Sequence, residues 1–83
     1  MGLQAYGIYL HGEKRFAEAV QAFRRCVALN PKAVSAWSNL ALSYRGTHQY
    51  SEALEAIVYA TRLEPSWHVA WLNLSTVCGL IGL

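Results

Sequence analysis

The chain has 83 residues, of which 54% are hydrophobic and 14% are charged, with a formal net charge of +2. A soluble domain usually has about 25% charged residues, so this chain, long enough for only one small domain, is expected to leave apolar surface for a partner. Its seven basic residues are scattered, which argues against nucleic-acid binding.

Two helices are predicted first along the chain, over residues 3–11 and 15–29. The first is expected to end near Gly12. Asn30-Pro31 ends the second, because proline disfavours helical geometry in the residue before it and has no amide hydrogen to donate. The two helices are therefore expected to form an antiparallel pair.

A second pair of helices is predicted over residues 33–47 and 50–63, with a break at Glu64-Pro65. In the first of them, four residues lie at i, i+3, i+4 and i+7 and so share one helix face. They are Trp37, Leu40, Ala41 and Tyr44.

The fifth predicted helix, residues 66–83, contains no Asp, Glu, Lys or Arg. Repeat arrays usually end on a helix with a polar outer face, and this segment lacks one. Its inward face is predicted to carry Trp71, Leu74 and Cys78. Its other faces offer four apolar residues as a docking surface, namely Val69, Leu72, Val77 and Leu80.

Three interpretations of this segment remain open. A further helix or a second chain covers it, or it anchors in a membrane, or it is a partly exposed terminus. As a helix, 18 residues reach about 27 Å, just short of the roughly 30 Å hydrocarbon core. The polar residues within it argue against the membrane.

A shift of 34 residues superimposes the parts of the chain on one another. Forward, the shift places Trp37 on Trp71, Asn39 on Asn73 and Leu40 on Leu74. Backward, it places Ala53 on Ala19, Ile57 on Phe23 and Pro65 on Pro31. This agreement indicates an internal repeat.

The central unit resembles the tetratricopeptide repeat, whose signature reads W-x2-L-G-x2-Y, then A-x3-F, then P. Residues 37–44 read W-S-N-L-A-L-S-Y, residues 53–57 read A-L-E-A-I, and Pro65 follows. Ala41 and Ile57 replace the family's Gly and Phe, and they keep the small size and the bulk that helix packing needs.

The resemblance implies an all-α fold, an α-solenoid of antiparallel helix pairs with two full 34-residue repeats plus one further helix. The whole chain, residues 1–83, would be one domain. Repeat one would cover 1–33, repeat two 34–67, and the leading helix of a truncated third repeat 68–83.

The resemblance also implies a site, because the first helix of each pair lines a concave groove in this family. Asn39 and Asn73 would align there, where an amide can donate to and accept from the backbone of an extended peptide. They could equally be solvated polar residues. The full set of groove candidates is Gln4, His11, Ser38, Asn39, Leu42, Arg45, Asn73 and Thr76.

The predicted function is therefore protein–protein interaction through peptide binding in the groove. The alternative is an assembly element, or a fragment of a larger protein or enzyme, that docks or self-associates through its apolar C-terminal helix. A clamp for a C-terminal carboxylate is disfavoured, because Arg45 and His11 are the groove's only basic candidates.

No catalysis, cofactor or metal is predicted. His11, His48 and His68 lie far apart in the sequence, and Cys26 and Cys78 form no CxxC pair and fall at core positions. The start of the chain reads as a repeat helix rather than a signal peptide, so an intracellular, cytoplasmic location is expected.

Overall fold

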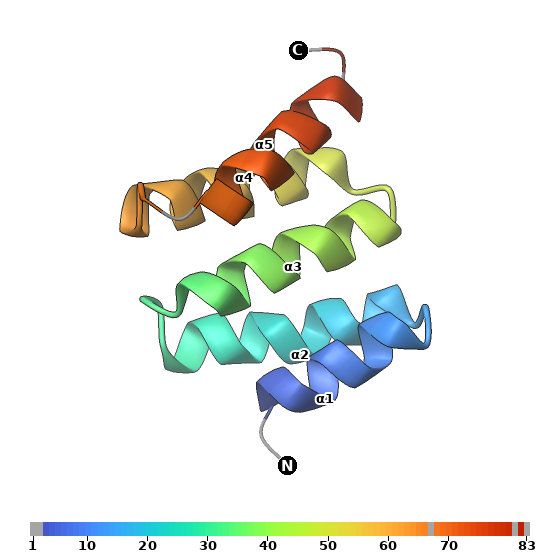
Figure 1. Cartoon of the computed structure of the whole chain (residues 1–83). Helices are drawn as coiled ribbons and strands as arrows, with labels where there is room; N and C mark the ends of the chain where they lie inside the picture. Colours follow the sequence, from blue (N-terminus) through green and yellow to red (C-terminus); the bar gives the residue numbers. More distant parts are fainter. Residues whose placement is uncertain (1–2, 67, 81, 83) are drawn as a thin grey trace.

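The computed structural model describes residues 3–66, 68–80 and 82, and within them the chain forms five helices and no strand. They stack in chain order, with the first pair at one end, α3 in the middle, and α4 and α5 at the other end (Figure 1). The helices are α1 (Leu3–Gly12), α2 (Phe16–Leu29), α3 (Val34–Gly46), α4 (Tyr50–Leu63) and α5 (His68–Leu80).

The predicted all-α fold is confirmed, and the predicted boundaries of the first four helices agree with the structure to within one residue. The fifth helix begins later than predicted, because Pro65 and Ser66 form a turn, and its described bounds are His68–Leu80. Residues 67, 81 and 83 of the predicted helix lie outside the described part of the chain. No helix in the described part of the chain combines the length and apolar character needed to cross a membrane.

The backbone repeats itself at the turns between paired helices. Lys14 and His48, which are 34 residues apart, both take the left-handed conformation, with φ of 60° and 62°. The next amide donates to a carbonyl five residues back in each case, from Arg15 to Leu10 and from Gln49 to Tyr44, both at 2.9 Å. The two tight turns therefore have the same geometry.

The proline breaks also repeat, and each is linked to the following helix by a tryptophan. The indole Nε1 of Trp37 donates to the carbonyl of Pro31, and that of Trp71 donates to the carbonyl of Pro65, both at 2.7 Å. Each bond spans six residues. The proline and the tryptophan of the repeat thus act together to orient one helix pair on the next.

The core lies between the helix layers, and its largest fully buried side chains include Leu10, Phe23 and Ile57. Phe23 and Ile57 fill equivalent places one repeat apart, as predicted. Most of the other core residues on α2 and α4 are alanines, and their small size lets neighbouring helices approach closely. At Gly7, an added Cβ would lie 2.7 Å from the Phe23 ring, so this approach requires glycine.

Two expectations for α5 were wrong. Val77, predicted on the outer docking surface, is only 2% exposed and belongs to the core, like its repeat equivalent Ser43. Trp71, predicted to face inward, is 48% exposed. The reason is that Tyr59 of α4 covers the equivalent Trp37, with ring centroids 4.5 Å apart, and no described helix covers Trp71 in this way.

The cysteines are more accessible than predicted, since both Cys26 and Cys78 are free thiols that are partly buried. Burial still raises the pKa of the Cys26 thiol, which disfavours the reactive thiolate. Among the described residues, no group of His, Cys, Asp or Glu is arranged to hold a metal ion.

Candidate interaction groove

The first helices of the repeats form one side of the stack. Helix α3 contacts both α1 and α5, and in Figure 1 the second helices α2 and α4 lie behind α1 and α5. Stacked helix pairs of this kind curve into a concave binding surface. Side chains on α1, α3 and α5 that point away from α2 and α4 are therefore the candidates for the groove.

A small cavity of about 60 Å³ opens between α1 and α3. Five residues line it: Ile8, His11, Phe23, Asn39 and Leu42. The structure thus brings together three predicted groove residues, one from α1 and two from α3. Phe23 supplies the buried floor, and Ile8 is 52% exposed at the opening. The site is mainly apolar, with one amide and one imidazole.

Asn39 has no hydrogen-bond partner among the described residues, although it is partly buried beside the cavity. Its carbonyl and amino groups are both free to bind a ligand. Asn73, its repeat equivalent, differs, because its Nδ2 donates to the Oγ of Ser38 at 3.0 Å. The two amides are therefore not an equivalent pair.

Ser38 was predicted to line the groove, but the structure buries it. It is only 3% exposed, since α5 packs over it and Asn73 occupies its hydroxyl. A ligand in the groove would not reach it. Its role is to join α3 to α5, the two helices that would form the C-terminal half of the groove.

The remaining predicted groove residues differ in availability. Arg45 is partly buried near the end of α3, and Thr76 is exposed on α5. The Thr76 hydroxyl donates to the carbonyl of Leu72 at 3.0 Å, which leaves its oxygen as an acceptor. The side chains of Gln4 and Val69 lie outside the part of the chain that the structure describes.

His11 adds little positive charge to the groove. Burial, and secondly the nearby Arg45 guanidinium, lower the pKa of His11 below its ordinary value of 6.5. The ring packs edge-on against Phe16 with centroids 5.0 Å apart, and Nδ1 lies 3.5 Å from the Ser43 hydroxyl. The lowered pKa favours the neutral imidazole, which packs against Phe16.

Acidification is expected to weaken the fold through His11. Below the ordinary pKa of 6.5, the unfolded chain binds a proton at this position more readily than the folded chain does. The stability contribution present above that pH is lost as the pH falls toward the lowered folded pKa. Urea unfolding at about pH 7.5 and about pH 5.5 should show a smaller loss for His11→Gln than for the wild type. Equal losses would show that His11 is not the cause.

The predicted docking surface on α5 is reduced to two described residues. Leu72 is 63% exposed and Leu80 is 49% exposed. Leu72 is the repeat equivalent of Ser38, which α5 covers. The exposure of Leu72 therefore marks the place where a further helix would pack if one were present.

Comparison with known proteins identifies the class. A tetratricopeptide-repeat family model matches residues 1–43, just over half of the chain. The chain belongs to the tetratricopeptide repeat family. No curated protein matches the sequence.

Solved structures share the fold at low sequence identity. The Sgt2 tetratricopeptide domain from Aspergillus fumigatus superimposes with a TM-score of 0.93 at 22% identity, over 96% of this chain and 53% of that one. The CopN–Scc3 complex gives 0.91 at 24% identity, over 96% and 47%. The second such domain of Spaghetti (RPAP3), bound to the HSP90 peptide SRMEEVD, gives 0.92 at 21% identity, over 96% and 74%. The chain spans about half the length of the first two.

Proposed function

We propose that this protein is an interaction module that binds an extended peptide segment in the groove formed by α1, α3 and α5. The observation that carries the proposal is the cavity between α1 and α3 with the unpartnered amide of Asn39 beside it. Membership of the tetratricopeptide repeat family supports it, as does a neighbour of the same fold whose structure contains a bound peptide.

The chemistry of the groove suits an uncharged, partly apolar segment. The Asn39 amide would pair with one peptide unit of the ligand backbone, donating to its carbonyl and accepting from its N–H. A small aliphatic side chain would enter the cavity between Ile8 and Leu42. Arg45 would add one charge-assisted contact where the ligand offers a carboxylate.

The HSP90 peptide bound by Spaghetti (RPAP3) ends in the acidic sequence EEVD. Positive charges would attract a ligand of that type. The described groove residues include Arg45 but no lysine. The lowered pKa of His11 disfavours its protonated, positively charged form. We therefore expect this protein to bind internal segments rather than to require an acidic C-terminus.

Assembly through α5 is the second candidate, and the exposure of Leu72 and Leu80 favours it. In this case the two leucines would pack on another helix, from a further repeat or from a second copy. The molar mass in solution tests the second of these, because a monomer at high protein concentration would rule out self-association through α5.

Affinity capture tests the groove directly. The immobilised wild type is compared with Asn39→Ala and with Leu72→Ser/Leu80→Ser, and captured proteins are quantified by mass spectrometry. Asn39→Ala is expected to reduce capture about tenfold, because two hydrogen bonds at roughly 0.5–1.5 kcal/mol each are lost. The leucine variant should capture normally.

Gln21→Ala is the matched control, since it removes an exposed side-chain amide from α2, away from the groove. Circular dichroism checks that each variant is folded. If the leucine variant alone loses the captured protein, docking through α5 replaces groove binding as the function.

A further inference from the structure

A second cavity, of about 270 Å³, lies between α3 and α4 and shares no residue with the groove. Leu40 and Ala56, each 3% exposed, form its apolar floor. The residues around them come from two helix faces that meet here. Because helical positions three, four and seven apart share a face, each helix contributes one continuous stripe to the cavity.

Helix α3 contributes Trp37 and Tyr44, and α4 contributes Tyr59, so aromatic rings line the cavity. The rings of Trp37 and Tyr59 lie 4.5 Å apart at 41°. The bond from the Trp37 indole to the Pro31 carbonyl orients the larger ring. Tyr59 is 41% exposed, so it presents aromatic surface to a ligand without rearrangement.

The same stripe of α4 carries two carboxylates, Glu52 and Glu55, at the edge of the cavity. Both are exposed, and neither forms an ion pair with any residue in 3–66, 68–80 or 82. Like charges three residues apart on a helix repel each other. A cation placed between them would remove this repulsion and gain two attractive contacts.

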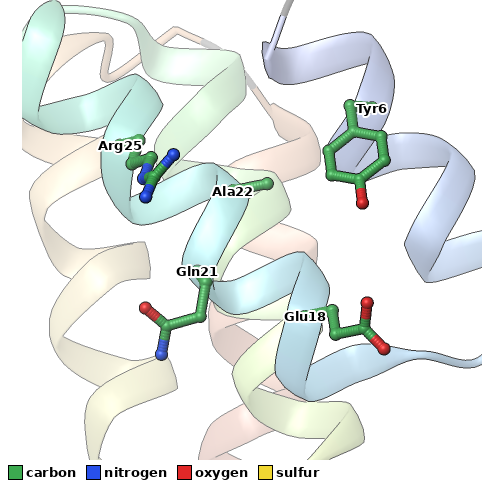
Figure 2. Close-up of a pocket in the computed structure, with 5 residues that line it drawn as sticks. All are labelled: Tyr6, Glu18, Gln21, Ala22 and Arg25. Carbon is green, nitrogen blue, oxygen red and sulfur yellow. The ribbon is translucent and has the colours of Figure 1, made fainter.

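The first repeat has a cavity at the equivalent place but with different chemistry. It measures about 260 Å³ and lies between α1 and α2, where Figure 2 shows Tyr6 facing α2. Glu18, the equivalent of Glu52, forms a salt bridge with Arg15, in which Arg15 Nη2 lies 2.6 Å from Glu18 Oε2. Gln21 stands in place of Glu55, and Arg25 in place of Tyr59.

The two repeats therefore have equivalent cavities, but the charged residues that line them differ. Two free carboxylates beside an aromatic pair occur in the second repeat only, within the described residues. Aromatic faces and carboxylates both attract organic cations, and here they lie side by side.

We propose that the cavity between α3 and α4 binds an arginine side chain presented by a partner protein. Its planar guanidinium would stack on Tyr59 and donate to the carboxylates of Glu52 and Glu55, while its aliphatic stem would lie on the apolar floor. Arginine suits this arrangement better than lysine, because its planar, weakly hydrated group both stacks and donates in a fork. This site is independent of peptide binding in the groove.

The test uses the tripeptide acetyl-Gly-Arg-Gly-amide as the probe. Its citrulline counterpart, which has the same shape but no charge, and its lysine counterpart serve as comparisons. Binding is followed by NMR through the Trp37 indole N–H and the Tyr59 amide. The arginine probe should bind at least about fivefold more tightly than the citrulline probe, because charge-assisted hydrogen bonds are roughly twice as strong as neutral ones.

Variants complete the test. Glu52→Gln/Glu55→Gln removes both charges from exposed positions without changing their shape, and it should weaken arginine binding about fivefold or more. Glu18→Gln, the equivalent change in the first repeat, should leave binding unchanged. Equal binding of the arginine and citrulline probes, or undiminished binding by the double variant, would overturn the proposal. Equal binding of the arginine and lysine probes would overturn the assignment to arginine.

Discussion

Phe23→Ala is expected to destabilise the protein by about 3–5 kcal/mol, because it leaves a cavity at the centre of the core. Phe23 is 1% exposed, and its ring fills the close approach of α1 and α2 at Gly7. A domain of this length has a total stability of only about 4–12 kcal/mol. The variant should therefore be largely unfolded or show a strongly lowered urea midpoint.

Leu29→Ala is the matched control for Phe23→Ala, because Leu29 lies on the same helix and is 78% exposed. Its effect should stay within about 0.5 kcal/mol. Comparable midpoints for the two variants would show that the core is not built around Phe23.

Gly46→Ala is expected to cost about 1–3 kcal/mol through overpacking. A Cβ at this last residue of α3 would overlap the ring of Phe16, which itself packs against His11. The Phe16 ring would have to shift to admit the added Cβ. The urea midpoint of the variant should fall accordingly.

The repeat supplies the control, since Gly12 occupies the same position one repeat earlier and has no neighbouring atom within 4 Å of an added Cβ. Gly12→Ala should be neutral or stabilising by up to about 1 kcal/mol, because alanine loses less backbone entropy than glycine in a helix. The same midpoint shift in both variants would contradict the role assigned to Phe16.

The helices and their order were predictable from sequence because proline breaks, apolar spacing and the 34-residue repeat all indicate the same elements. The repeat also assigned Phe23 and Ile57 correctly to the core. It misplaced Val77 and Trp71 because the sequence of α5 is apolar on nearly every face, so its rotation depends on contacts with α3 and α4. The repeat aligns Val77 with Ser43, but a serine in the sequence gives no sign that its position is buried, as it is in the structure.

Three of the residues predicted for the groove lie together in the structure. His11, Asn39 and Leu42 line one cavity as their helix positions suggest. The bond from Asn73 to Ser38 was not predictable, because it depends on how closely α5 packs on α3. That contact removes Ser38 from the groove and distinguishes two asparagines that the sequence presents as equivalent.

The cavity between α3 and α4 was not predicted, because the repeat signature covers buried helix positions and not the exposed residues at the edge of the cavity. The available signal was the spacing of Glu52, Glu55 and Tyr59, which places the three residues on one face of α4. Without the fold, nothing indicated that this face lies beside Trp37.

Chemical-shift mapping by NMR shows whether a bound peptide lies in the groove. A peptide covering the contact segment of a captured partner is added to the isotopically labelled protein. The largest shifts are expected at the side-chain amide of Asn39 and at Ile8 and Leu42. Shifts confined to Leu72 and Leu80 on α5, with Asn39 unchanged, would contradict peptide binding in the groove.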